Sequence, residues 1–347
     1  MFNIFRLFKK KMPQTATIQH CLLPFQEIEI TQNGDVYTCC PNWNNNYSIG
    51  NIYKNDFKDV WNSEKVIELR KRILKNDYSL CNKNVCPLIT NKNFGTRWEI
   101  HSKPKMKTFP KIIKFSYDQE CNIVCKICRK EIIKNNKKDL DLLNSKIETF
   151  FLPLLKNAEV LYISGLGDPF GSRHSRLLIK KAQEKYPKLK FDIQTNGLLC
   201  NEKNLKNLNI APENIECIRI SVHATTVDTY AKIVKNGEKY FPIIKQNLHY
   251  LGDLRKTYGF DFFIHFVVTA DNYKEIPLFI KFAEKINAEP RFWEFRFSNC
   301  QYEIQKNICV TDNKHPEYEE LVKVMQHPLV KANRRLFSPI LANLIKD

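Results

Sequence analysis

The chain has 347 residues, 43% of them hydrophobic and 12% aromatic, so it can bury a large core and is too apolar to be intrinsically disordered. Its formal net charge of +18 is spread along the whole sequence, which favours a charged, solvated surface over a single basic face built for nucleic acid. Its apolar runs are far shorter than the ~20 residues of a membrane-spanning helix, and its first residues lack the pattern of a secretory signal. We therefore expect a globular, cytoplasmic protein with no transmembrane segment. In that compartment clustered cysteines serve as metal ligands rather than disulfides.

The N-terminal part is predicted to contain a basic tail, residues 1–14, and a small unit rich in cysteine and turns, residues 15–108. Within this unit Ile28–Ile30 and Val36–Thr38 flank a turn, which predicts a β-hairpin. Apolar residues at mostly helical spacing predict one helix from Asp56 to Leu74. The unit is therefore expected to be a small α+β domain.

From residue 109 to 299 the sequence alternates between strand-like and helix-like segments, which predicts a parallel sheet covered by helices. Six strands are expected, beginning near Ile112, Val160, Phe191, Cys217, Phe262 and Phe292. Six units are too few for a closed eight-stranded barrel, so the alternatives are a partial, open barrel and a doubly wound sheet. Residues 300–347 are expected to add one or two helices at one end.

Most of these strands are polar at one side-chain parity and apolar at the other. In the fourth strand Arg219, Ser221 and His223 alternate with apolar residues, and in the last strand Glu294 and Arg296 do so. If helices cover the apolar face, the polar face lines the interior, where charges are costly unless they pair or meet a ligand. We therefore predict a cavity for a polar substrate rather than a sheet face open to water. The candidate substrate contacts are Arg219, His223, Glu294 and Arg296.

Three cysteines within eight residues, Cys121, Cys125 and Cys128, follow the first of the six strands. They are therefore expected in a loop at the carboxyl end of a strand, where α/β barrels keep their active sites. Three thiolates at this spacing can hold an iron-sulfur cube by three corners only. The fourth iron would then be open, and an open metal position is where chemistry takes place.

Together with later motifs, this loop resembles the cluster loop of the radical S-adenosylmethionine (radical SAM) enzymes, and the resemblance spans residues 110–300. The cysteines match the CxxxCxxC pattern of that family, although Ile127 stands where an aromatic residue is usual. The segment from Gly165 to Asp168 resembles the family's glycine-rich motif. Asn196 and Ser221, at the ends of the third and fourth strands, lie where the family contacts its cofactor.

The resemblance implies a fold, a partial (βα)6 radical SAM barrel, and an activity. In that family a [4Fe-4S] cluster binds SAM, and an electron from a reductant such as flavodoxin or ferredoxin cleaves it to a 5'-deoxyadenosyl radical. The radical then takes hydrogen from the substrate, here expected to be polar, a peptide or a sugar derivative. The cofactor-binding residues that the resemblance implies are Gly165, Gly167, Asp168, Asn196 and Ser221.

Residues 15–108 resemble the SPASM or twitch type of auxiliary-cluster domain, which more commonly follows the barrel than precedes it. The resemblance implies one auxiliary iron-sulfur cluster, of the [4Fe-4S] type and with no open iron. Its ligands would be Cys21, Cys39, Cys81 and Cys86. Two alternatives stay open, namely zinc as the metal and Cys40 in place of Cys39 as the ligand.

The sequence thus predicts a radical SAM oxidoreductase or modifying enzyme whose substrate it does not identify. Two other functions are weighed against this one. The first is a non-catalytic iron-sulfur or zinc protein for electron transfer or assembly. The second is an RNA-modifying radical SAM enzyme, which the net charge would favour, although we do not expect a nucleic-acid partner.

Overall fold

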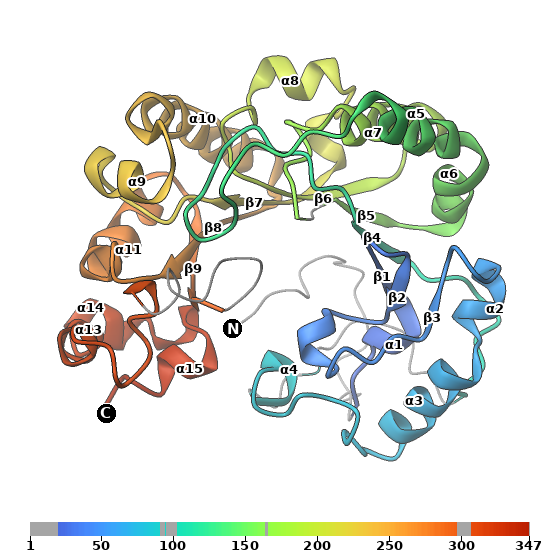
Figure 1. Cartoon of the computed structure of the whole chain (residues 1–347), viewed down its shortest axis with the longest axis horizontal. Coiled ribbons are helices and arrows are strands. Elements are labelled where there is room, and N and C mark those ends of the chain that lie inside the picture. Colours follow the sequence, from blue (N-terminus) through green and yellow to red (C-terminus); the bar gives the residue numbers. More distant parts are fainter. Residues whose placement is uncertain (1–19, 91–93, 95–102, 164–165, 297–306, 347) are drawn as a thin grey trace.

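One curved sheet is built from strands between residues 27 and 294. The computed structural model describes residues 20–90, 94, 103–163, 166–296 and 307–346, and within them nine strands pair in the order β3-β2-β1-β4-β5-β6-β7-β8-β9. The two ends of this order are not paired with each other, so the sheet is open. Figure 1 shows it as a horseshoe with helices around its outer side.

The six predicted strands are confirmed. They are parallel neighbours in sequence order, as the alternation with helices requires. Their bounds are β4 Ile112–Ser116, β5 Val160–Ile163, β6 Lys190–Thr195, β7 Ile215–Ser221, β8 Asp261–Val268 and β9 Glu289–Glu294. The open barrel is therefore the correct alternative, and the doubly wound sheet is not.

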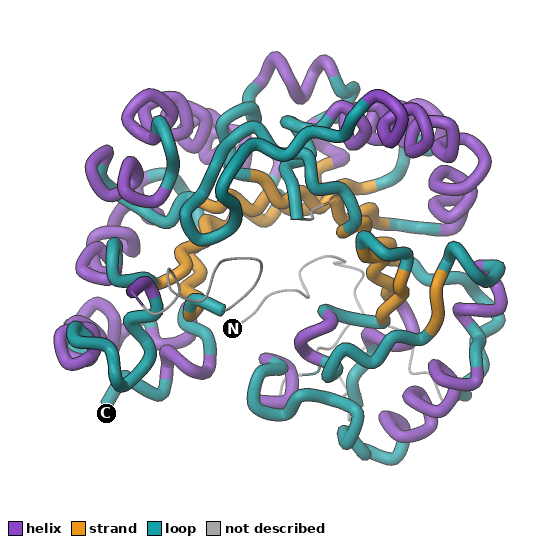
Figure 2. Tube along the Cα trace, viewed as in Figure 1, coloured by secondary structure: helices purple, strands orange, loops and turns teal. Residues whose placement is uncertain are grey.

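Helices cover the outer face of these strands (Figure 2), which places the apolar side-chain parity in a core between sheet and helices. Ile218 and Ile220 of β7, for example, are fully buried. Polar caps begin several of the helices: the side chains of Ser172, Asn201 and Thr226 accept backbone N–H groups of the first turn. The helices are α5 Lys137–Lys146, α6 Leu152–Leu154, α7 Arg173–Lys185, α8 Glu202–Asn207, α9 Val227–Ile233, α10 Gly237–Tyr258 and α11 Ile276–Lys285.

The N-terminal unit shares the sheet of the barrel. The predicted hairpin is present as β1 Glu27–Thr31 and β2 Asp35–Tyr37, with Gly34 in the left-handed conformation of its turn. The same β1 pairs in parallel with β4, which adds a seventh parallel strand that the sequence did not indicate. A short strand, β3 Gly50–Asn51, completes this edge.

The prediction of a single helix from Asp56 to Leu74 is wrong, since the structure has two helices there, α2 Phe57–Trp61 and α3 Glu64–Leu74. The break lies at Ser63, whose hydroxyl accepts the N–H of Val66 and thereby starts α3. Two shorter helices, α1 Leu23–Gln26 and α4 Pro87–Thr90, begin just after Cys21 and Cys86.

Among the described residues of the C-terminal end the structure has three helices, where one or two were expected. They are α13 Tyr318–Met325, α14 Pro328–Ala332 and α15 Pro339–Ala342, and proline opens the last two. The ring of Phe337 stacks on Phe292 of β9 with 4.4 Å between centroids, which fixes this segment against the sheet.

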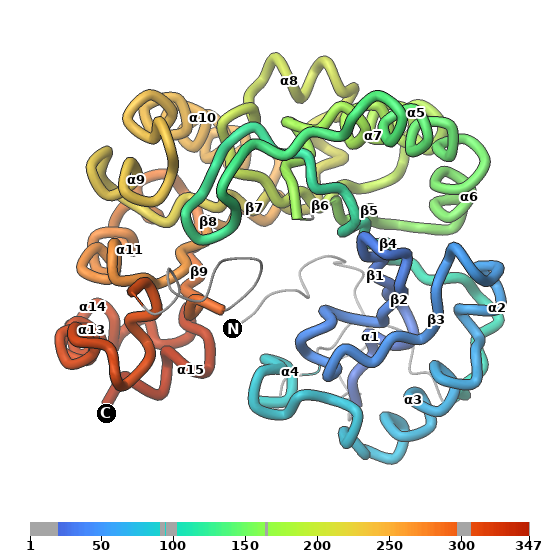
Figure 3. Tube along the Cα trace, viewed as in Figure 1, coloured from blue at the N-terminus to red at the C-terminus, as the bar shows by residue number. Residues whose placement is uncertain are grey.

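The colours of Figure 3 follow the chain once around the horseshoe, so the N-terminal unit and the C-terminal helices flank its opening. In the part of the chain that the structure describes, no helix combines the length and the apolar character needed to cross a bilayer. The predicted tail, residues 1–14, lies outside the described residues, and the predicted unit boundaries stay predictions.

Candidate active site and cluster sites

The loop with Cys121, Cys125 and Cys128 follows β4 and is clamped by backbone hydrogen bonds. Cys125 forms a β-bridge with Val234, and the N–H of Lys126 donates to the carbonyl of Ile233 at 2.8 Å. The three thiols lie near one another: burial raises the pKa of Cys125, and the charges of Cys128 and Cys121 raise it further. The structure thus brings the three predicted cysteines together at the carboxyl end of the sheet.

Arg129 is a residue of this loop that the sequence analysis missed. Its guanidinium donates to Cys128 Sγ at 3.5 Å and to the carbonyl of Gln119 at 2.9 Å, and it also contacts the carbonyl of Leu166. Burial lowers the pKa of Arg129, but the negative charges of Cys128 and Cys121 outweigh that effect and raise it. Arg129 therefore joins the cysteine loop to the glycine-rich segment and places a positive charge beside the thiols.

The glycine-rich segment lies directly on the start of the cysteine loop. A Cβ at Gly167 would stand 2.3 Å from the carbonyl oxygen of Glu120, to which Asp168 donates its N–H at 2.8 Å, so this approach requires glycine. The buried Asp168 carboxylate accepts four hydrogen bonds, from Thr195 Oγ1 and from backbone N–H groups of residues 170, 171 and 196. Asp168 therefore connects the chain after β5 to the end of β6. Gly165 lies outside the described residues.

The end of β6 contacts the same loop, and the end of β7 is bonded to β8. Asn196, after β6, donates its side-chain amide to Asn122 Oδ1 at 2.8 Å and to Cys121 Sγ at 3.8 Å. Ser221 ends β7 and is partly buried. His223, at φ +63°, accepts the N–H of Val267 at 3.0 Å, and burial lowers its pKa to about 4. Its imidazole is thus neutral and holds β7 to β8.

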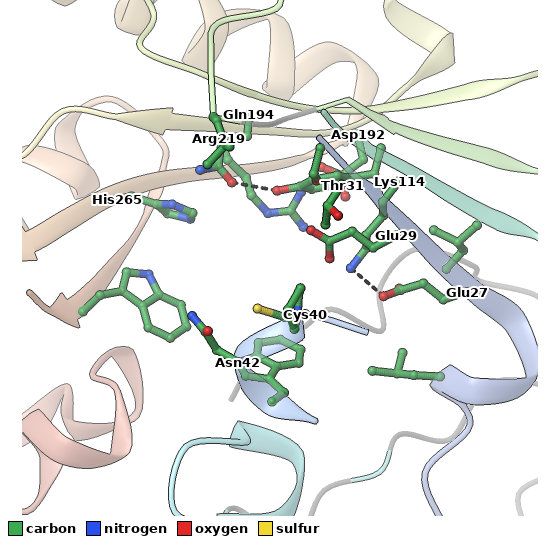
Figure 4. A pocket seen from close by; sticks show the side chains of 18 of the residues that line it. Glu27, Glu29, Thr31, Cys40, Asn42, Lys114, Asp192, Gln194, Arg219 and His265 are labelled. Atoms are coloured by element: carbon green, nitrogen blue, oxygen red, sulfur yellow. Dashed lines mark hydrogen bonds and ion pairs between the residues drawn. The ribbon is translucent and has the colours of Figure 1, made fainter. Parts of the chain in front are cut away.

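The inner face of the sheet lines a cavity of about 570 Å³, shown in Figure 4. The predicted polar parity of β4 to β8 faces it, and β1 adds Glu27, Glu29 and Thr31. The segment Cys40–Trp43 of the N-terminal unit covers the opposite side. The strand residues that line it are Glu27, Glu29, Thr31, Ile112, Lys114, Ser116, Tyr162, Asp192, Gln194, Arg219, Phe263, His265, Arg291 and Trp293.

Of the four predicted substrate contacts, Arg219 lines this cavity and the other three do not. His223 is engaged with β8, as described above. Phe292 of β9 packs outward against Phe266 and Phe337, so Glu294 also points away from the cavity, where it binds Ser338 Oγ and Arg296. The parity expected for the last strand is therefore wrong, and Arg291 and Trp293 face inward instead.

The four cysteines predicted for an auxiliary cluster line one small, mostly apolar cavity in the N-terminal unit, together with Leu69, Ile73 and Leu88. Burial raises the pKa of Cys39, and the charge of Cys21 raises it further, so these thiols are close neighbours. Cys40 lies in the wall of the large cavity instead. The geometry therefore favours Cys39 as the fourth ligand. The members of the set are Cys21, Cys39, Cys81 and Cys86.

These donor sets fit iron-sulfur clusters, because each is made of thiols alone and is largely screened from water. Among the described residues, no three His, Cys, Asp or Glu side chains stand as close as ligands of a single ion would. In a cube each protein thiolate binds a different iron atom, so its thiolates need not converge on one point.

Residues 21–87 match the SPASM family model, described as an iron-sulfur cluster-binding domain. A stretch of 125 residues is 32% identical to the FeMo cofactor biosynthesis protein NifB of Methanocaldococcus infernus and covers 33% of this chain and 40% of that protein. The chain thus spans well under half of the length of this curated relative.

Two solved structures are similar over part of their length. Streptococcus suis SuiB bound to S-adenosylmethionine matches with a TM-score of 0.43 and 16% identity, over 65% of this chain and 49% of SuiB. The radical S-adenosylmethionine methyltransferase TsrM of Kitasatospora setae, solved with cobalamin and a [4Fe-4S] cluster, matches with a TM-score of 0.34 and 11% identity, over 51% and 34%.

Proposed function

We propose that this chain, a radical SAM enzyme with a SPASM domain, binds SAM at a [4Fe-4S] cluster on Cys121, Cys125 and Cys128 and abstracts hydrogen from a polar substrate in the large cavity. When bound, the cluster and SAM supply a 5'-deoxyadenosyl radical, which no side chain can provide. One observation carries the proposal: the clamped cysteine loop meets the ends of β5 and β6 at the rim of a sheet whose inner face lines a charged cavity.

In this proposal the residues of the chain bind SAM and orient the cysteine loop. Asn196 holds the cysteine loop through Asn122, and Asp168 fixes the backbone after Gly167 through its four hydrogen bonds. We assign the backbone around Gly167 to the methionine end of SAM and Ser221 to its ribose. Asp168 then acts on SAM through the groups that it positions, since its own oxygens are already engaged.

The four cysteines of the small cavity hold the auxiliary cluster in this proposal. Cys39 belongs to that site, and its neighbour Cys40 lies in the wall of the large cavity. The peptide bond between Cys39 and Cys40 therefore links the auxiliary site to the wall of the substrate cavity, a covalent route for an electron. Flavodoxin or ferredoxin would supply the electron that SAM cleavage consumes.

The cavity suits a substrate group of small-molecule size, because its 570 Å³ falls within the usual 300–1,000 Å³ of ligand pockets. Such a space has room for part of a peptide or for a sugar derivative. A peptide or a sugar derivative is therefore the substrate that we propose.

The test is SAM cleavage by the anaerobic protein. With both clusters loaded and a strong reductant present, the enzyme should release 5'-deoxyadenosine from SAM, and Cys125→Ala should abolish the release. Cys200→Ala, a buried thiol outside both cysteine sets, serves as the matched control and should retain it. A fully iron-loaded protein that releases no 5'-deoxyadenosine would instead favour a non-catalytic iron-sulfur protein.

A further inference from the structure

The charges on the described wall of the large cavity are paired, with one exception. Lys114 Nζ stands 2.6 Å from Glu27 Oε1, and Arg219 forms an ion pair with Asp192. Arg291 pairs with Glu289, which lies just behind the wall, at 2.7 Å. Glu29 is the wall carboxylate to which the structure gives no ion pair within 4 Å among the described residues. The three carboxylates and three cations of the wall balance in number, but Arg291 is engaged by Glu289 behind the wall, so Glu29 is left without an ion-pair partner of its own.

Glu29 stands in the middle of β1 and faces the cavity from the edge that the N-terminal unit adds (Figure 4). Its register partner on β4 is Lys114, whose ammonium pairs with Glu27 instead. Burial raises the pKa of Glu29, whereas the charge of Lys114 and the hydroxyl of Ser116 lower it. A carboxylate that is poorly compensated in this way gains most from a cation that a ligand brings.

The surroundings favour an ammonium group as that cation. The rings of Trp43, Phe263 and Trp293 belong to the same wall, and aromatic faces attract organic cations. The existing cations already use such faces: the Arg219 and Arg291 guanidinium groups lie 5.7 and 4.8 Å from the centroid of Phe263. A substrate amine that donates to Glu29 would enter the same cavity that these rings line.

We infer that Glu29 is a recognition residue for a positively charged amino group, and that the substrate of this enzyme carries a primary amine next to the part that reacts. The inference rests on the proposed function and narrows its substrate class. Because Glu29 comes from β1, the N-terminal unit then has a second role beside holding a cluster: it supplies the specificity of the barrel.

The experiment compares amines with their hydroxyl analogues on the holoenzyme. Anaerobic calorimetry with SAM bound would measure the affinity for glucosamine against glucose and for cadaverine against 1,5-pentanediol. A charge-assisted hydrogen bond predicts a preference for the amine of about tenfold or more in each pair. Glu29→Gln should remove this preference without weakening the hydroxyl compounds, Glu29→Asp should keep part of it, and Glu159→Gln, an exposed carboxylate outside the cavity, should keep all of it.

Equal affinity within both pairs, or no binding of either amine, would overturn the inference, as would an amine preference that survives Glu29→Gln. The iron content and thermal unfolding of each variant establish that it is folded and loaded. If Glu29→Gln fails to fold, Glu29→Asp decides instead: a reduced amine preference supports the inference, and an unchanged preference overturns it. 5'-deoxyadenosine release by the wild type tests the proposed function separately, so an enzyme that cleaves SAM but ignores amines refutes this inference alone.

Discussion

Cys39 and Cys40 offer a matched test of the auxiliary site, because two identical neighbouring side chains face different cavities. Cys39 shares the small cavity with the three other cysteines of its set, and Cys40 lines the large one. The backbone at Cys40, with φ −51° and ψ 127°, is polyproline-like, a conformation in which consecutive side chains do not share one side. Only one of the two thiols can therefore reach the auxiliary cluster.

Replacement of each cysteine by serine keeps the side-chain size and removes one thiolate. Cys39→Ser takes away one of four ligands, so the iron content of the reconstituted protein should fall from about eight to about four atoms per chain. Cys40→Ser should keep about eight. Iron and sulfide analysis with the visible absorbance of the clusters measures both, and each variant should retain the cluster on Cys121, Cys125 and Cys128.

The opposite result would refute this reasoning. If Cys40→Ser lost half of the iron and Cys39→Ser kept it, the assignment of the two side chains to their cavities would be wrong. If Cys39→Ser kept all of its iron and instead bound one zinc ion per chain, the auxiliary site would be a zinc site.

Three further predictions follow from single contacts. Gly167→Ala should lower the rate of 5'-deoxyadenosine release at least tenfold and the free energy of unfolding by about 1–3 kcal/mol, because its Cβ would meet the carbonyl of Glu120. Chemical unfolding measures the second effect, and unchanged values would contradict that contact. Arg129→Gln should lower the reduction potential of the neighbouring cluster in a titration followed by electron paramagnetic resonance, whereas Lys130→Gln should leave it nearly unchanged, and equal potentials in all three proteins would show that the Arg129 charge has no such role. The pKa of His223 is about 4 in the folded state and about 6.5 in the unfolded state, so between these pH values the unfolded state binds the extra proton. The free energy of unfolding should therefore fall by about 3 kcal/mol as the pH drops from 6.5 to 4, and His223→Gln should reduce this slope in pH-dependent unfolding.

The strands that line the cavity could be predicted because their alternation is local. Ile218 and Ile220 are fully buried and Arg219 faces inward, as a period of two requires. The prediction for β9 was wrong because large side chains occur on both faces of this strand. The C-terminal segment decides between them: Phe337 stacks on Phe292 from outside, which turns Arg291 into the cavity.

The place of β1 could not be predicted, since its pairing partner lies about 80 residues away and no local pattern encodes a parallel pair at that distance. β1 also contributes Glu27 and Glu29 to the cavity wall, and no sequence motif had indicated these two residues. Arg129 was missed for another reason. Its role depends on carbonyl groups of residues 119 and 166, which only the folded loop brings together.

The central claim is that the cluster on Cys121, Cys125 and Cys128 keeps one iron open for SAM. Electron paramagnetic resonance of the reduced Cys39→Ser variant, with and without SAM, tests it most directly, because that variant should hold this cluster alone. Our account predicts that SAM shifts the g-values of the signal. A fully loaded cluster whose spectrum stays the same at saturating SAM would contradict it.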